Sequence, residues 1–200
     1  SPAEMAAAKA AVGWRKLRLA ARARTVTLLV PHMRLDLGGI AKGYAADQAL
    51  KLLKGRGLTR ALVAASGDIA LGDPPPGQRG WRVGITPIGV HTNQLARTVL
   101  LHNVGISTSG DTEQSIELQG VRYSHILDPG TGLGLTNRIQ ASVIAPNATA
   151  SDSLATTVCV LGPSRGLRLA DSLPGTASYI VVKEGGGMRS FVSKRFPRRE

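Results

Sequence analysis

Cysteine and aromatic residues are scarce in this sequence, and each scarcity excludes a class of protein. Cys159 is the single cysteine, which excludes an internal disulfide framework and a cysteine-based zinc site. Phe, Trp and Tyr make up 4% of the residues, which leaves little for stacking against bases. Acidic residues are few as well, because 13 Asp and Glu face 25 Lys and Arg, a formal net charge of +12. This charge attracts polyanions in general, and we expect no specific nucleic-acid binding.

Long apolar runs are also absent. No run approaches the roughly 18 apolar residues of a membrane span. The N-terminal sequence "SPAEMAAAKAAVGWRKL" lacks the basic-then-apolar order of a signal peptide, so the chain carries no recognisable targeting signal. These residues resemble a helix from inside a fold rather than the start of one, and we expect an earlier N-terminal segment to be missing. The 200 residues, 42% of them hydrophobic, predict one domain over residues 1–200.

Predicted helices and strands follow one another irregularly along the chain. Helices are predicted at residues 3–18, at 40–54, from about 151 onward and at 163–172. Strands are predicted at residues 24–31, 60–72, 81–88, 98–110, 114–127, 139–146, 177–185 and 189–196, with a hairpin turn at Gln119-Gly120. Because strict βαβ alternation is absent, the pattern favours an α+β fold over a doubly wound sheet.

A glycine pair stands at the mouth of the helix in "RLDLGGIAKGYAADQALKLLKGRG", residues 34–57. Gly38 and Gly39 indicate either unusual backbone angles or the close approach of a ligand. Their backbone groups could serve an anion or a metal, with Lys42 one turn further on as a phosphate-facing ammonium. A tight turn and a solvated lysine explain the same residues, and both interpretations stay open. The Walker A pattern is absent.

A carboxylate and a hydroxyl lie four residues apart in "NATASDSLATTVCVLG", residues 147–162. On a helix, Asp152 and Thr156 share one face and could present oxygen ligands to a magnesium ion. Alternatively, Asp152 stabilises the N-terminus of its own helix and Thr156 only packs, which the spacing alone favours. Cys159, in the same stretch, is expected to be a small buried hydrophobe.

Three further stretches combine polar and small residues. In "YSHILDPGTG", residues 123–132, His125 is a candidate base with Asp128 nearby, although a lone histidine is more often structural. His32, His91 and His102 have no comparable polar neighbourhood. "ASGDIALG", residues 65–72, and "GISTSGD", residues 105–111, are predicted as small-residue turns where a ligand could touch the backbone, or as plain hairpin turns.

Taken in order, "LDLGGIAKGYAAD", "ASGDIALG", "GISTSGD", "YSHILDPGTG" and "ASDSLATTVCVLG" resemble the ApbE family, the FAD:protein FMN transferases. The resemblance runs from about Leu35 to Gly162. It implies a single α+β domain of the T-fold type, with a mixed, largely antiparallel sheet and packed helices. It also implies an enzyme that splits FAD with magnesium, attaches FMN to a threonine or serine of an acceptor protein and releases AMP.

The resemblance also implies a role for particular residues. The metal site would be formed by the carbonyl of Gly39 and the side chains of Asp152 and Thr156. Residues expected to contact FAD or line its cleft are Asp36, Lys42, Asp68, Ser109, His125 and Ile126. His125 is the candidate catalytic base for the acceptor hydroxyl.

The sequence departs from the family pattern at two small residues and at its start. Ser66-Gly67-Asp68 replaces a glycine-glycine-acid signature, and Ser151 replaces an alanine before the metal aspartate. We expect the family's N-terminal flavin-contacting segment to lie outside this sequence, which leaves non-catalytic FAD binding as an alternative. FAD hydrolysis to FMN and AMP is another alternative, because the same metal site would serve both reactions. By resemblance, the expected acceptor is a redox protein, associated with membrane redox complexes outside the cytoplasm, in the periplasm or cell envelope.

Overall fold

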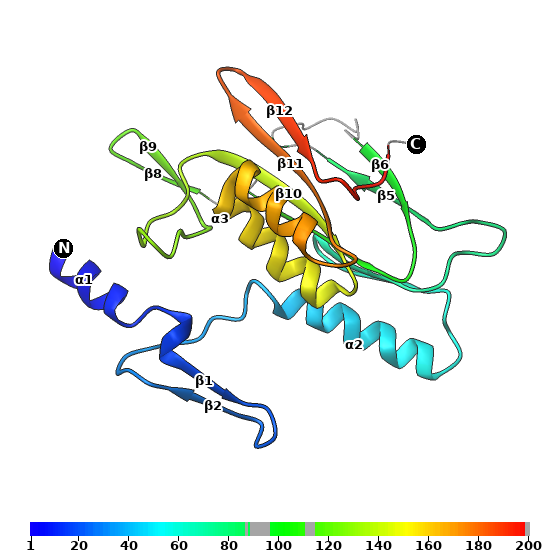
Figure 1. The fold of residues 1–200 in the computed structure, drawn as a ribbon, viewed down its shortest axis with the longest axis horizontal. Helices are drawn as coiled ribbons and strands as arrows, with labels where there is room; N and C mark the ends of the chain where they lie inside the picture. The colour runs from blue at the N-terminus through cyan, green and yellow to red at the C-terminus, as the bar shows by residue number, and fades with distance from the viewer. Residues whose placement is uncertain (87, 89–96, 111–114, 199–200) are drawn as a thin grey trace.

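The computed structural model describes residues 1–86, 88, 97–110 and 115–198 (Figure 1). Its helices within these ranges are α1 (Pro2–Ala10), α2 (Ala41–Gly55) and α3 (Ala148–Ser172). Its strands are β1 (Leu17–Ala20), β2 (Thr25–Leu28), β3 (Leu62–Ala65), β4 (Asp68–Leu71), β5 (Trp81–Ile85), β6 (Arg97–Leu101), β7 (Gly105–Gly110), β8 (Ser115–Leu118), β9 (Val121–Ser124), β10 (Arg138–Ala145), β11 (Ala177–Glu184) and β12 (Gly187–Val192).

An antiparallel sheet organises the molecule. Among the described residues it has six strands in the order β12-β11-β10-β7-β4-β3, and each neighbouring pair is antiparallel. The pairs β1–β2, β5–β6 and β8–β9 form separate two-stranded ladders. Helices α2 and α3 pack against each other and against the sheet (Figure 1). The prediction of an α+β fold with a largely antiparallel sheet is confirmed.

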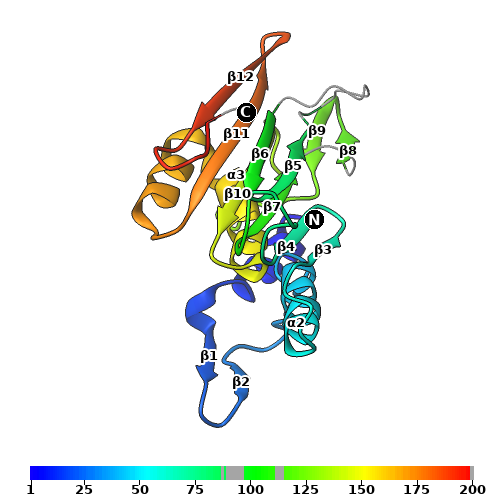
Figure 2. The same ribbon diagram turned by 90° about the vertical axis from the view of Figure 1, so that its right-hand side faces the viewer.

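The sheet carries a different core on each face. Side chains alternate along a strand, so Ile139, Ala141 and Val143 of β10 pack against α3, and Ile144 joins the opposite cluster. That opposite cluster contains the β5–β6 ladder, which lies over the sheet on the side away from α3 (Figure 2). The central strands are therefore covered on both faces, which explains why β10 reads as an apolar run rather than as an alternating one.

Two predicted elements divide differently in the structure. The helix predicted over residues 3–18 ends at Ala10, since a tight 3-10 turn at Trp14–Lys16 follows Gly13, whose φ is +140°, and β1 starts at Leu17. The strand predicted over residues 60–72 is the hairpin β3–β4. Its turn includes Ser66, at a φ of +59°. The strand prediction was too long because a turn made of small residues carries little local signal.

Strand β7 and helix α3 can be compared with two further predictions. The strand predicted over residues 98–110 divides into β6 and β7, so residues 105–110 are a strand of the sheet and the alternative of a turn at 105–111 is wrong. Asp111 and His91 lie outside the described residues. Helix α3 begins at Ala148, three residues before the predicted start, and non-helical Gly162, whose φ is +71°, separates its first part from the segment that ends at Ser172, in agreement with the second helix predicted at 163–172. The predicted Gln119-Gly120 turn is confirmed, with φ angles of +52° and +75°.

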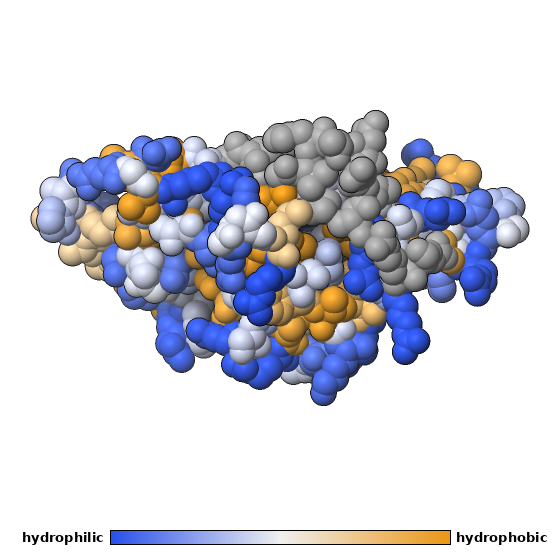
Figure 3. Space-filling view, turned by 90° about the horizontal axis from the view of Figure 1, so that it is seen from above, coloured by the Kyte–Doolittle hydropathy of each residue, from blue (hydrophilic) through white to orange (hydrophobic). Residues whose placement is uncertain are grey.

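Residues 1–29, which we call the N-terminal arm, project away from the sheet (Figures 1 and 2). None of the residues in α1, β1 or β2 is buried. Hydrophilic side chains are spread across the face seen in Figure 3 rather than gathered in one patch. Among the described residues, no helix combines the length and apolarity that crossing a membrane requires.

Candidate functional site

One cleft of about 290 Å³ collects every residue that the sequence analysis singled out for the site. It lies where the start of α2 meets β4, β7, the loop after β9 and the first turns of α3. Its lining includes the predicted residues Asp36, Gly39, Lys42, Asp68, Ser109, His125, Ile126, Asp152 and Thr156. Gly38, Thr108 and Leu127 complete the lining. The predicted residues come from distant parts of the chain, and folding places them together.

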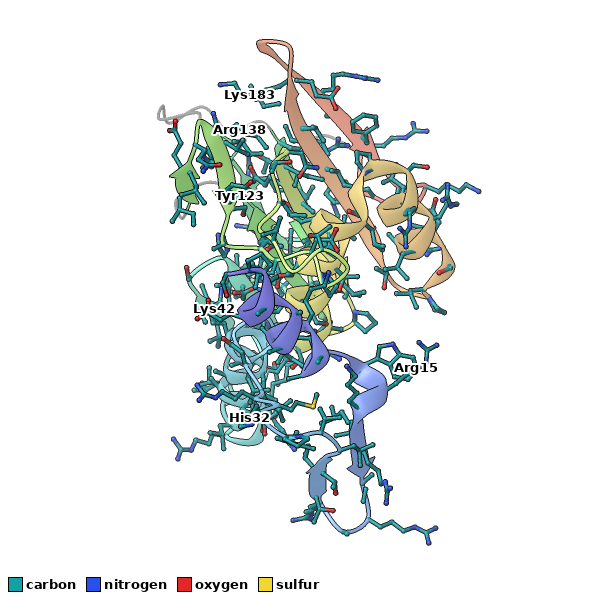
Figure 4. The ribbon with its side chains drawn as sticks, turned by 90° about the vertical axis from the view of Figure 1, so that its left-hand side faces the viewer. Arg15, His32, Lys42, Tyr123, Arg138 and Lys183 are labelled. Carbon is teal, nitrogen blue, oxygen red and sulfur yellow. The ribbon has the colours of Figure 1, made fainter. Side chains whose placement is uncertain are left out.

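Lys42 and Asp68 form an ion pair across the cleft. Lys42 Nζ lies 2.6 Å from Asp68 Oδ2, with the lysine half exposed and the aspartate only 2% exposed. Figure 4 shows Lys42 on α2 near the sheet. The Asp68 carboxylate raises the pKa of Lys42 above its usual 10.5. Lys42 therefore stays cationic at every physiological pH, with its ammonium at the cleft wall.

Asp152 is a buried carboxylate, 4% exposed, that reaches across to the neighbouring helix. Its Oδ2 accepts a hydrogen bond of 2.9 Å from the backbone N–H of Gly43, in the first turn of α2. Burial raises the pKa of Asp152, with a further increase from nearby Asp68, while the Gly43 N–H opposes the shift. Asp152 thus caps α2 rather than only its own helix. Asp152 therefore does more than stabilise its own helix. One of its oxygens is already bonded to α2, and a metal ion would share the carboxylate with that hydrogen bond.

Helices α2 and α3 cap each other, which the sequence analysis missed. Asp47 of α2 accepts hydrogen bonds from the backbone N–H groups of Ala148 and Thr149, at 2.9 and 2.8 Å. A Cβ atom on Gly43 would lie 2.2 Å from the carbonyl oxygen of Ala148, so glycine is required where the helices meet. In the sequence, the one indication of this close contact is Gly43, the glycine inside "AKGYAAD". This close contact fixes the position of Asp152 relative to α2.

Hydroxyl groups connect β7 to α3 beneath the cleft. Ser109 Oγ and Thr156 Oγ1 are 3.1 Å apart, and Ser107 Oγ and Ser151 Oγ are 2.7 Å apart. The serine at position 151 therefore makes a contact that alanine could not make. Cys159 donates a weak hydrogen bond to the carbonyl oxygen of Ser109, and burial raises the pKa of this thiol to about 12. The prediction that Cys159 is a buried hydrophobe is confirmed.

The glycine pair borders the cleft, with Gly39 on the side of the Thr156 hydroxyl. Asp36 Oδ1 accepts a 2.7 Å hydrogen bond from the N–H of Gly38, which shapes the turn that leads into α2. A Cβ atom on Gly39 would lie 4.0 Å from Thr156 Oγ1. The backbone of Gly39 therefore borders the cleft opposite Thr156 without a side chain between them.

His125 lies at the exposed side of the cleft, next to buried Ile126. The N–H of Ile126 donates to Ser124 Oγ at 3.1 Å, which holds the segment in place. Asp128 Oδ1 accepts from the N–H of Gly130 at 2.8 Å, so this carboxylate supports its own turn. His32 instead lines a separate cavity beside α1, and His102 is exposed. His125 is thus the histidine that the described structure brings to the cleft.

The donor set in the cleft fits a hard cation. In the described parts of the chain, no three or more His, Cys, Asp or Glu side chains group as a metal site. The ligands expected from the family resemblance are the carbonyl of Gly39, the carboxylate of Asp152 and the hydroxyl of Thr156, and these three residues line one cleft together with Asp36 and Asp68. Magnesium prefers oxygen ligands and usually keeps water and substrate phosphate in its shell, so a small protein donor set suits it. The raised pKa of buried Asp152 also fits a carboxylate that a cation would stabilise.

The fold and cleft define a class: an antiparallel α+β domain with an oxygen-rich site between two mutually capped helices. Within that class, the chain belongs to the ApbE family, whose model matches residues 1–181. This match extends on both sides of the motif region that suggested the family.

Curated relatives and solved structures agree with this assignment. A FAD:protein FMN transferase of Klebsiella pneumoniae (strain 342) is 34% identical over 195 residues, covering 96% of this chain and 55% of the relative. That of Escherichia coli (strain K12) is 35% identical over 170 residues, covering 84% and 48%. The flavin transferase ApbE from Vibrio cholerae superposes with a TM-score of 0.85 at 29% identity, covering 98% of this chain and 62% of that one.

A second solved structure, the apo form of the Pseudomonas stutzeri flavinyl transferase ApbE, gives a TM-score of 0.81 at 33% identity, covering 97% of this chain and 59% of that one. The chain spans about half the length of the curated relatives that it matches. These comparisons confirm the α+β fold and the family.

Proposed function

We propose that this chain is an FAD:protein FMN transferase, which moves FMN from FAD to a threonine or serine hydroxyl of an acceptor protein and releases AMP. The names of its relatives support this activity. The observation that carries the proposal is the gathering of nine residues, chosen from separate motifs, around one cleft. Since that cleft holds about 290 Å³, it suits the diphosphate part of FAD rather than the whole dinucleotide.

The transfer is a substitution at phosphorus. The acceptor oxygen forms a bond to the phosphorus of the FMN half, and the bond from that phosphorus to the bridging oxygen breaks. AMP leaves with the electron pair, and the acceptor hydroxyl loses its proton. In this proposal His125 receives the proton, which its position at the exposed side of the cleft, where a protein substrate has access, supports.

Charge neutralisation and positioning supply most of the catalysis in phosphoryl transfer. The ammonium of Lys42 faces the diphosphate in our proposal, and buried Asp68 holds this ammonium in place. Gly39, Asp152 and Thr156 would hold magnesium, which when bound neutralises charge on the phosphoryl oxygens. The close contact of Gly43 with α3 fixes Asp152 relative to α2, the helix that carries Lys42.

The test is incubation with FAD, magnesium and a candidate acceptor protein, followed by gel fluorescence and separation of free flavins. Flavin fluorescence on the acceptor band supports transfer. Free FMN and AMP without labelled acceptor would replace the proposal with FAD hydrolysis, in which water takes the place of the hydroxyl. Neither product would indicate a non-catalytic FAD-binding protein. Asp152→Asn is the matched control, since it removes the proposed metal charge but keeps an oxygen acceptor for Gly43.

The acceptor and the compartment are proposals by family resemblance. We propose a redox subunit outside the cytoplasm, associated with a membrane redox complex, as the acceptor. Flavin fluorescence of membrane fractions from cells with and without the intact gene measures this directly. Unchanged covalent flavin in the membrane fraction would contradict it.

A further inference from the structure

A second cavity, of about 260 Å³, lies on the other face of the sheet. Its walls come from the β3–β4 turn and from β5, β7 and β10. Ile69, Val83, Ile85 and Ile106 supply an apolar lining. Cavities with apolar walls and a few polar groups are typical ligand sites, and planar rings suit the space between side chains of two sheets.

This cavity adjoins the cleft already described. Thr108 lines both spaces. Asp68 belongs to the cleft, whereas Gly67 and Ile69, its neighbours in sequence, line the cavity. A ligand that occupied both spaces would pass the turn at Ser66 and Gly67, where side chains are small. The two spaces therefore suit the two parts of one extended molecule.

Gln140 gives the cavity a specific polar group. The side chain is 4% exposed and lines the cavity wall. Its Nε2 donates a 2.7 Å hydrogen bond to the carbonyl oxygen of Thr86, which fixes the direction of the amide. Its Oε1 is buried and has no hydrogen-bond partner among the described residues. A buried acceptor without a partner is destabilising, so an unpaired one at a cavity wall indicates a missing donor.

We propose that Gln140 reads one ring of the dinucleotide in this cavity, with Oε1 accepting a hydrogen bond from an N–H on the ring edge. The proposal rests on the proposed function, since it takes FAD as the ligand. Adenine offers its exocyclic amino group, and the flavin ring offers its imide N–H. A glutamine amide pairs with adenine through one acceptor and one donor, which matches the second hydrogen still carried by Nε2.

The experiment compares FAD binding by the wild-type chain and Gln140→Leu, with AMP, inosine 5′-monophosphate and riboflavin as competitors. The dissociation constant for FAD should rise about tenfold in the variant, as expected for one lost hydrogen bond. If the ring is adenine, AMP loses affinity in the variant, and the wild-type preference for AMP over inosine monophosphate disappears. If the ring is the flavin, riboflavin loses affinity and AMP does not. Gln48→Leu, the same change on an exposed face of α2, should leave every constant unchanged.

Thermal unfolding without ligand tests whether Gln140 binds the ring of FAD or only stabilises the fold. The leucine variant removes the buried unpaired oxygen but also the Nε2 hydrogen bond to Thr86, so these two effects offset each other and its melting temperature should change little. A lower melting temperature with an unchanged FAD constant would overturn the inference and leave Gln140 as a tether for Thr86. Unchanged binding of FAD by the variant overturns the inference alone. Absence of FAD binding by the wild-type chain would instead overturn the proposed function.

Discussion

The cleft and the N-terminal arm reverse the usual relation between polarity and burial. Around the cleft, Asp68, Ser107, Ser151 and Asp152 are all buried. In the arm, apolar side chains such as Leu19, which is 69% exposed, lie open on a two-stranded ladder. Hydropathy alone would have placed these two groups the other way round.

The difference shows what burial of polar groups requires. A buried polar group is costly unless it has a partner. In the cleft each partner comes from another element: Lys42 for Asp68, the Gly43 N–H for Asp152, and Ser151 for Ser107. In the described part of the chain, no residue of the arm's ladder is buried, as expected for a two-stranded ladder that has no third layer over it. The buried polar groups of the cleft are therefore held by specific partners. Substitutions there should change activity or stability more than substitutions in the arm do.

The largest effect is expected for Asp152→Asn, which should abolish magnesium-dependent FAD turnover. The substitution removes the charge of the proposed metal ligand but leaves an oxygen for the Gly43 N–H, so the melting temperature should change little. Loss of a metal ion that supplies several kcal/mol of charge stabilisation corresponds to about 10³-fold or more in rate. Steady-state turnover at limiting magnesium measures this. Turnover equal to wild type would refute the metal assignment.

Thr156→Ala should lower magnesium-dependent turnover less than Asp152→Asn does, because water can replace a hydroxyl ligand. The same assay at limiting magnesium measures this difference.

His125→Ala should lower the rate of flavin transfer by about 10²- to 10⁴-fold, while FAD affinity changes much less. The reason is that His125 is proposed to take the proton of the acceptor hydroxyl rather than to hold FAD. Single-turnover rates at saturating FAD, together with the FAD dissociation constant, separate the two roles. A normal rate with weakened FAD binding would assign His125 to binding alone.

Lys42→Ala should weaken FAD binding by about 10- to 150-fold and riboflavin binding hardly at all, since a charge-assisted contact to the diphosphate contributes about 1.5–3 kcal/mol. Lys42→Arg keeps the charge beside Asp68 and is the control. Fluorescence titrations with both ligands measure the ratio. Equal losses for FAD and riboflavin would show that Lys42 acts through structure.

The pH dependence of this ion pair follows from its direction of shift. The folded-state pKa of Lys42 lies above 10.5, so the stabilisation by the pair is complete below pH 10.5 and is lost as the pH rises through the raised value. The effect on stability is small because the lysine is half exposed. FAD affinity should therefore show no Lys42 titration between about pH 7 and 10.

Gly43→Ala should destabilise the fold by about 1–3 kcal/mol and reduce turnover, because the added Cβ would lie 2.2 Å from the Ala148 carbonyl and force α2 and α3 apart. Gly55→Ala is the matched control at the last residue of α2, where an added Cβ would meet nothing within 4 Å. Chemical denaturation of both variants gives the comparison. Equal stability of the two would contradict the close helix contact.

Motifs in the sequence predicted the cleft, whereas contacts between distant segments were not predictable. Lys42 and Asp152 could be selected because each lies in a local motif that resembles a known family. The pairing of Asp47 with the start of α3 joins residues about one hundred positions apart, and no local pattern encodes it. The orphaned oxygen of Gln140 likewise depends on which carbonyl its amide reaches. The end of α1 was misjudged because the prediction carried the helix past Gly13, whose φ of +140° is incompatible with an α-helix.

The smallest effect is expected in the arm. Leu19 and Val26 face each other across β1–β2 and are 69% and 51% exposed, while Val83 and Val99 face each other across β5–β6 and are buried. Val26→Ser should change the free energy of unfolding by less than about 0.5 kcal/mol, as is usual for surface positions. Val99→Ser makes the same change at a fully buried position and should cost about 1–3 kcal/mol or more, because it loses apolar burial and leaves a hydroxyl to satisfy. Urea denaturation of the two variants measures the contrast between these two ladders. A loss of more than about 1 kcal/mol in the free energy of unfolding for Val26→Ser would show that the arm is covered in solution. The apolar side chains of the arm would then be buried, and only the cleft would depart from the usual relation between polarity and burial.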